Sequence, residues 1–164
     1  MHQYLLLKIK HYLALFLAGL LSAIVVTVLW QVVCRYLFNS PSTVSEEIAR
    51  FLLIWIGLLG ATYAYMDNAH IGMDFVINKL SLKQQTLSKI LAHCSALLFS
   101  IAVLIVGGVN LVELTLVPVQ RSAALGIKMA YVYAVLPISG LLMAFAALAH
   151  LQHCNNTSTD NKEH

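Results

Sequence analysis

Residues 11–34 read HYLALFLAGLLSAIVVTVLWQVVC, an apolar run of 24 residues without Asp, Glu, Lys or Arg. An α-helix needs ~20 such residues to cross the ~30 Å hydrocarbon core of a bilayer. Three further runs free of these four residue types lie at 51–66, 90–112 and 129–149. The run at 51–66 has only 16 residues. We therefore expect its helix to begin earlier, with Glu46, Glu47 and Arg50 at the level of the lipid headgroups.

The composition supports a membrane protein, because 60% hydrophobic and 10% charged residues would leave a soluble domain with too little polar surface. In lipid only helices and closed barrels satisfy the backbone polar groups, and long runs without alternation exclude a barrel. We predict an all-α membrane protein with one four-helix transmembrane domain over 1–150 and a disordered polar tail over 151–164. The expected spans are 12–34, 46–66, 88–113 and 129–149.

The orientation follows from the Lys and Arg residues outside the spans, since positive loops stay in the cytoplasm. The N-terminal tail, the 67–89 segment and the C-terminal tail hold 6 of them, and the 35–50 and 113–128 segments hold 4. Both termini are therefore expected in the cytoplasm. Lys8 and Lys10 precede the first run as in a secretory signal, but the run is too long for one and we expect it to be retained.

Cysteine and net charge add little to the functional reading. Cys34, Cys94 and Cys154 are isolated, and no intramolecular disulfide is expected. The net charge of +3 comes largely from cations that flank apolar spans, as anionic membrane lipid favours. Nucleic-acid binding has no support in this pattern.

A polar segment before the second span begins a helix. Thr43 and Glu46 have capping-box spacing, and Glu46 with Glu47 places negative charge at the positive end of the helix dipole. Glu46 and Arg50 can pair four residues apart, and Arg35, at the end of the first span, could bridge to Glu47. These residues are either headgroup-level charges with ordinary capping roles or a network that fixes the helix pair or docks a partner.

The segment 67–80, DNAHIGMDFVINKL, connects the second and third spans. Its apolar side chains recur at helical spacing, at Met73, Val76, Ile77 and Leu80. This spacing predicts a short amphipathic helix along the cytoplasmic interface. His70 and Asp74 are four residues apart and could be read as metal ligands, but two ligands without a third make a weak site.

The last predicted external loop holds Arg121 and leads into Tyr131, an aromatic that suits the interfacial belt. Pro137 lies inside the fourth span, where the loss of one backbone hydrogen bond predicts a kink. Trp30 and Trp55 lie within apolar runs. Each either faces lipid or packs between helices, or forms a large flat anchor for a second membrane protein.

The spans lack the groups that membrane-embedded chemistry uses. A transporter acting alone places an ionisable group deep in the bilayer, yet 12–34 has no acidic residue, which argues against a small multidrug exporter. There is no Cys-x-x-Cys pair, and His93 is the only histidine well inside a span, which argues against a disulfide-generating oxidase and a haem-bearing bundle. No catalytic set is apparent. We expect no enzyme and no cofactor, but a partner of a protein that performs the chemistry.

Several short motifs resemble those of one family. They are RYLFN at 35–39, EEIARFLLIW at 46–55, GA at 60–61, DNAHIGMD at 67–74 and ALGI at 124–127, followed by Tyr131, Tyr133 and Pro137. In order, spacing and placement they resemble the small membrane subunit, of the DctQ type, of TRAP (tripartite ATP-independent periplasmic) transporters. The resemblance covers residues 30–140, and Lys128 departs from it where such proteins often have proline.

The resemblance implies a scaffold subunit of a secondary importer in the bacterial inner membrane. In such systems a periplasmic binding protein transiently delivers an organic acid to the complex. A large elevator-type permease subunit then moves the acid inward with sodium. The small subunit is a fixed support for the large one and holds no known substrate, ion or metal site, which agrees with the lack of buried charge in these spans.

By analogy with that family, the charged groups at the two membrane faces would brace helices or meet partners. Near the periplasmic face these are Arg35, Glu46, Glu47 and Arg50. At the cytoplasmic turn they are Asp67, His70 and Asp74. Trp55 and Arg121 complete the candidate set of partner-binding or helix-bracing residues.

Two other functions remain open on the sequence. A self-contained small permease or membrane enzyme would be active without a partner. A structural four-helix assembly factor would bind other membrane proteins without supporting uptake. Because the binding protein and large subunit set the substrate in the resembling family, the sequence leaves C4-dicarboxylates, sialic acid and other sugar acids as candidates.

Overall fold

The computed structural model describes residues 2–40, 42–67 and 82–160. These residues form helices and no strand, and four helical stretches are long and apolar enough to cross a membrane. The stretches are Leu6–Leu37, Thr43–Met66, Ile90–Leu116 and Met129–Gln152. The predicted all-α fold with four spans is therefore confirmed, whereas the predicted interfacial helix falls on residues outside the described ranges.

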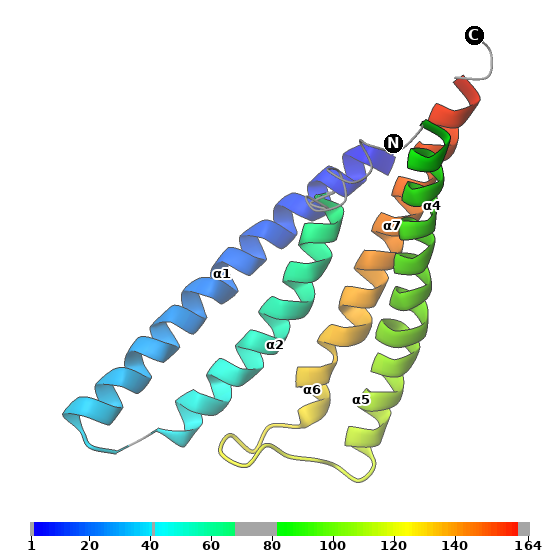
Figure 1. The fold of residues 1–164 in the computed structure, drawn as a ribbon. Coiled ribbons are helices and arrows are strands. Elements are labelled where there is room, and N and C mark those ends of the chain that lie inside the picture. Colours follow the sequence, from blue (N-terminus) through cyan, green and yellow to red (C-terminus); the bar gives the residue numbers. More distant parts are fainter. Residues whose placement is uncertain (1, 41, 68–81, 161–164) are drawn as a thin grey trace.

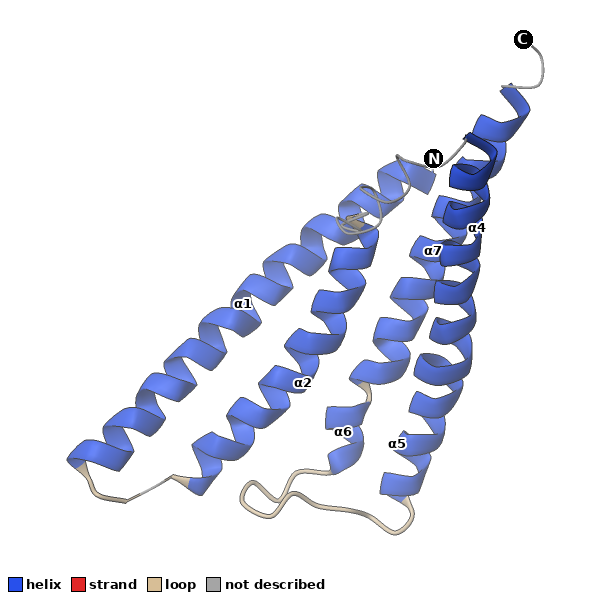
Figure 2. Ribbon diagram, viewed as in Figure 1, coloured by secondary structure: helices blue, strands red, loops and turns tan. Residues whose placement is uncertain are grey.

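The helices form two antiparallel pairs (Figures 1 and 2). The first pair is α1 (His2–Leu37) and α2 (Thr43–Met66). The second pair runs from α4 (Leu82–Phe99) through the π-helix η1 (Ser100–Gly107) into α5 (Gly108–Leu116), and returns through α6 (Met129–Tyr133) and α7 (Val135–Asp160). The pairs lie close together at the end with both chain termini, here called the termini end. They diverge toward the opposite end, here called the loop end, which carries the 117–128 loop.

The turn between α1 and α2 is set by residues that leave helical geometry easily. Asn39 adopts a left-handed backbone conformation with φ 47°, which asparagine tolerates better than most residues. The N–H of Ser40 donates to the carbonyl oxygen of Cys34 at 3.3 Å. The last turn of α1 is closed in this way, and the chain reverses direction into α2.

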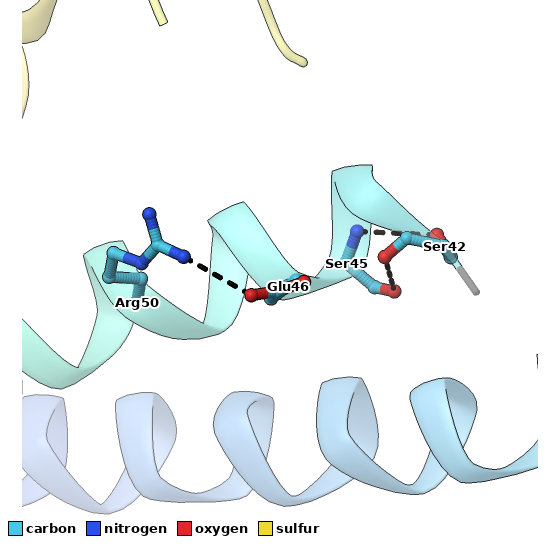
Figure 3. Close-up of polar contacts among 4 residues, drawn as sticks. All are labelled: Ser42, Ser45, Glu46 and Arg50. Atoms are coloured by element: carbon cyan, nitrogen blue, oxygen red, sulfur yellow. Dashed lines mark hydrogen bonds and ion pairs between the residues drawn. The ribbon is translucent and has the colours of Figure 1, made fainter. Parts of the chain in front are cut away.

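The start of α2 differs by one residue from the predicted capping box (Figure 3). Ser42, not Thr43, is the N-cap, and its hydroxyl accepts a hydrogen bond from the N–H of Ser45 at 3.3 Å. The Ser45 hydroxyl donates back to the Ser42 carbonyl at 3.1 Å. Serine is preferred over threonine as an N-cap residue. The earlier start leaves the Glu46 carboxylate available for a pair with Arg50.

The fourth span is broken near the loop end. The helix α6 ends at Tyr133 and α7 begins at Val135, so Ala134 interrupts the helix. Pro137 lies three residues after this break. Proline has no N–H for the carbonyl four residues earlier, here that of Tyr133. This loss explains the break, and the predicted kink is confirmed just before the proline. At its other end α7 continues to Asp160, so it covers most of the segment predicted as a disordered tail.

Close contact between α7 and the η1–α5 helix depends on small residues. A Cβ atom added to Gly140 would lie 2.8 Å from side-chain atoms of Leu104 and Ile105. The backbone oxygen of the fully buried Ser139 accepts a hydrogen bond from the Thr62 hydroxyl on α2 at 3.4 Å. Small side chains let membrane helices approach closely, and hydroxyls bond across them. This packing makes α7 the centre of the bundle.

Candidate functional site

The main polar contact at the loop end joins α2 to the 117–128 loop. The Glu47 carboxylate accepts hydrogen bonds from the backbone N–H groups of Ala124 and Leu125 at 3.0 and 2.9 Å. The buried Ser122 contributes a hydroxyl that accepts from the same Leu125 N–H at 3.3 Å. Gly126 closes the turn with φ 68°, a left-handed conformation that favours glycine. Glu47 therefore ties together two segments that are 77 residues apart in the chain.

The predicted bridge between Arg35 and Glu47 is not formed among the described residues. The Glu47 Oε2 atom instead accepts hydrogen bonds from two backbone N–H groups. Arg35 lies in the last turn of α1 and is exposed. The sequence placed Glu47 among the partner-binding or helix-bracing candidates with Arg35 as a possible partner. Its contact with the loop was not foreseen, because the position of the loop over α2 is not encoded in local spacing.

The predicted pair between Glu46 and Arg50 is confirmed. The Arg50 guanidinium lies 3.2 Å from the Glu46 carboxylate, and both side chains are about two thirds exposed (Figure 3). Exposed pairs at this spacing contribute about 0.3–0.5 kcal/mol in water. The pair therefore adds little to the stability of the fold, and it leaves two charged groups exposed at the loop end.

The other two loop-end candidates also have defined contacts. The Arg121 guanidinium donates to the carbonyl oxygen of Gly126 at 3.2 Å, within its own loop. Trp55 packs edge-to-face on Phe16 of α1, with ring centroids 6.4 Å apart. Trp55 is part of the packing between α1 and α2, as the helix-packing alternative in the sequence analysis proposed.

An apolar cavity of about 280 Å³ lies beside Trp55 at the loop end. Leu20 of α1, Phe51 and Trp55 of α2, Ile127 of the loop and Tyr131 of α6 contribute to its lining. We call this cavity the loop-end groove. It lies where the two helix pairs diverge, and no charged side chain lines it.

At the termini end, Asp67 caps α2 and forms an ion pair with Lys10 of α1. The Lys10 ammonium also lies 5.8 Å from the centre of the Tyr63 ring. The ion pair between Lys10 and Asp67 therefore joins α1 to α2. The candidate residues His70 and Asp74 lie outside the described residues.

A second polar group at the termini end was missed by sequence reasoning. The hydroxyl of Tyr65 on α2 shares a 2.8 Å hydrogen bond with Nδ1 of His93 on α4. The His93 ring is stacked on His150 of α7, with centroids 5.2 Å apart and planes 16° apart. His93 stood out as a histidine inside a span, but its partners come from helices that are distant in sequence. Three helices are joined by this aromatic group.

These observations define a class of protein: a multi-pass helical membrane protein whose polar side chains tie its helices together at both ends. The chain belongs to the DctQ component family of the tripartite ATP-independent periplasmic (TRAP) transporters, which matches residues 24–154. This is a family of transporter subunits rather than of enzymes. Together with the four apolar helices, it makes the chain a multi-pass protein of the bacterial inner membrane.

The chain is similar to several curated TRAP proteins. It is 34% identical over 134 residues to the sialic acid TRAP transporter small permease protein SiaQ of Vibrio cholerae, covering 79% of this chain and 73% of that one. It is 35% identical over 80 residues to a putative TRAP transporter small permease protein of Haemophilus influenzae, covering 49% of this chain and 50% of that one. It is 30% identical over 142 residues to the isethionate TRAP transporter permease protein DctMQ of Oleidesulfovibrio alaskensis, covering 83% of this chain but 22% of that one.

Proposed function

We propose that this chain is the small scaffold subunit of a TRAP-type importer and pairs with a large elevator-type permease subunit. The complex takes up an organic acid with sodium, after a periplasmic binding protein delivers the acid. The observation that carries the proposal is the match to DctMQ, in which a segment similar to 83% of this chain is part of a much longer permease. A segment joined to a permease in one protein is expected to bind that permease when it is a separate chain.

The pairing surface that we propose is the outer face of α1. Within its most apolar stretch 11% of the residues are buried inside the chain, against 39% for the fourth span. Leu29 on α1 and Leu141 on α7 are equally exposed, at 61% each. A photo-crosslinking amino acid at position 29 is expected to capture the large subunit. The same amino acid at position 141 tests whether the large subunit contacts α7 instead. Crosslinking at position 141 and not at 29 would move the pairing surface to α7.

The candidate residues divide into two roles in this proposal. Glu47, Asp67 and Trp55 have partners inside the chain, which supports a bracing role. Arg35 and Arg50 are exposed at the loop end, which suits contact with the large subunit or the binding protein. Replacing Arg35 by glutamine is expected to reduce uptake without changing the stability of the isolated chain.

The orientation that we propose places both termini in the cytoplasm and the loop end toward the periplasm. The support is the count of Lys and Arg residues, 6 on the side of the termini and 4 on the other. A reporter that is active only in the cytoplasm tests this when fused to the C-terminus. Activity of a periplasm-specific reporter at that position would reverse the orientation.

The function is tested by affinity purification of the chain from its native membrane in mild detergent, followed by uptake assays in cells that lack it. A stoichiometric multi-span partner, and sodium-dependent uptake of one organic acid that is lost with the chain, are the expected results. The panel should include sialic acid, C4-dicarboxylates, isethionate and other sugar acids. Recovery of the chain alone, with uptake intact in its absence, would contradict the scaffold role.

A further inference from the structure

Two cations lie side by side in the 117–128 loop. The N–H of Ser122 donates to the Ile127 oxygen at 2.9 Å, and the N–H of Met129 donates to the Gln120 oxygen at 3.0 Å. These bonds flank Arg121 and Lys128, which face each other in an antiparallel bridge. In a pair flanked in this way the side chains are at their closest and leave the same face.

Like charges directly opposite each other are unfavourable. Within residues 2–40, 42–67 and 82–160, neither Arg121 nor Lys128 forms an ion pair with a carboxylate. The Glu47 carboxylate reaches the same loop through the backbone N–H groups of Ala124 and Leu125, and its negative charge offsets part of the charge of the two cations. With two cations and one carboxylate, the loop carries a net positive charge that a bound anion would neutralise.

The loop-end groove is lined by residues next to these cations in the chain. Ile127, which precedes Lys128, lines the groove, and Tyr131, one helical turn after Lys128, lines it as well. On α2 the lining extends from Ile48 to Trp55, a rise of about 10 Å at 1.5 Å per residue. That depth is about a third of the ~30 Å hydrocarbon core, so the groove reaches from the cationic loop into the acyl-chain region.

We propose that this groove is a binding site for an anionic phospholipid, with one acyl chain against Trp55 and the phosphate beside Arg121 and Lys128. The apolar lining matches an acyl chain, and the paired cations match the charge of the headgroup. Neither feature alone would distinguish this site from ordinary lipid contact. Their occurrence in one loop and one groove matches a lipid with an acyl chain and a negative headgroup.

The two tryptophans of the chain make the proposal testable by fluorescence. Trp55 lines the groove, whereas Trp30 on α1 is 55% exposed and lies outside it. The full chain carrying Trp30→Phe is placed in phosphatidylcholine vesicles that contain a small fraction of either brominated phosphatidylglycerol or brominated phosphatidylcholine. Trp55 is expected to be quenched at up to roughly 30-fold lower fractions of phosphatidylglycerol, since each Lys or Arg near an anionic membrane surface contributes an attraction of about 1 kcal/mol.

Two matched variants complete the experiment. Lys128→Gln removes one cation without removing a hydrogen bond of the loop, and is expected to reduce the preference for phosphatidylglycerol about fivefold. Trp55→Phe leaves Trp30 as the probe of ordinary lipid contact, where no headgroup preference is expected. Equal quenching of Trp55 by both lipids, or the same preference at Trp30, would overturn the proposal. An unquenched Trp55 would also overturn it and would indicate that protein fills the groove.

Discussion

Replacement of Gly108 by alanine tests the packing of α7 against the η1–α5 helix. A Cβ atom at this position would lie 2.8 Å from Leu136 Cβ, 2.9 Å from Pro137 Cδ and 3.0 Å from Pro137 N. None of these atoms is the end of a flexible side chain, so the backbones of two helices must separate. Overpacking of this kind costs about 1–3 kcal/mol.

The neighbouring Gly107 provides a matched control. A Cβ atom there would have a single neighbour within 4 Å, the Ala102 oxygen at 3.8 Å. Both substitutions gain the helix propensity of alanine, about 1 kcal/mol in a helix interior, so the difference between them isolates the packing cost. We expect Gly108→Ala to be less stable than Gly107→Ala by about 1–3 kcal/mol.

The assay is equilibrium unfolding of each purified variant by sodium dodecyl sulfate in mixed micelles, followed by circular dichroism. The expected difference corresponds to a change of about 5- to 150-fold in the ratio of folded to unfolded protein. If Gly108→Ala were as stable as Gly107→Ala, the close approach of the two helices at this point would be refuted. Uptake by the assembled complex gives a second readout of the same change.

Further changes test the polar contacts at both ends of the bundle. Glu47→Gln should weaken the tie between α2 and the loop before α6 and speed proteolysis of that loop, whereas Glu46→Gln, which removes a surface pair, should leave the rate unchanged. Tyr65→Phe should lower the unfolding free energy by about 1 kcal/mol, measured in the same detergent titration, because a buried hydrogen bond is lost. Lys10→Asp should destabilise the chain by placing like charges together, and adding Asp67→Lys should restore up to about 1 kcal/mol; no recovery in the double variant would contradict the ion pair.

The four spans could be predicted from the sequence because the hydrogen bonds that the backbone needs in lipid form within each helix. A run such as 11–34 must be helical in lipid whatever it packs against. The kink before Pro137 was predictable for the same reason, since proline removes a bond within its own helix. The Glu46–Arg50 pair, four residues apart on one helix, was also within reach of local rules.

Contacts between distant segments were not predictable in this way. The Glu47 carboxylate was expected to pair with the guanidinium of Arg35, but it accepts hydrogen bonds from backbone N–H groups. Almost every residue type carries this donor, so the sequence does not mark the partner. Tyr65, His93 and His150 come from three helices whose relative register depends on small residues such as Gly108. Single-helix periodicity contains no information on that register, so the aromatic group at the termini end was missed.

The way in which Glu47 holds its loop has a consequence for sequence variation. The carboxylate accepts hydrogen bonds from the backbone N–H groups of Ala124 and Leu125, and these bonds do not involve the side chains of either residue. Any residue except proline supplies the same donor, so these two hydrogen bonds place no demand on the side chains at positions 124 and 125. The attachment of the loop to α2 therefore depends on the Glu47 side chain, and a change of the exposed Ala124 side chain leaves these hydrogen bonds in place.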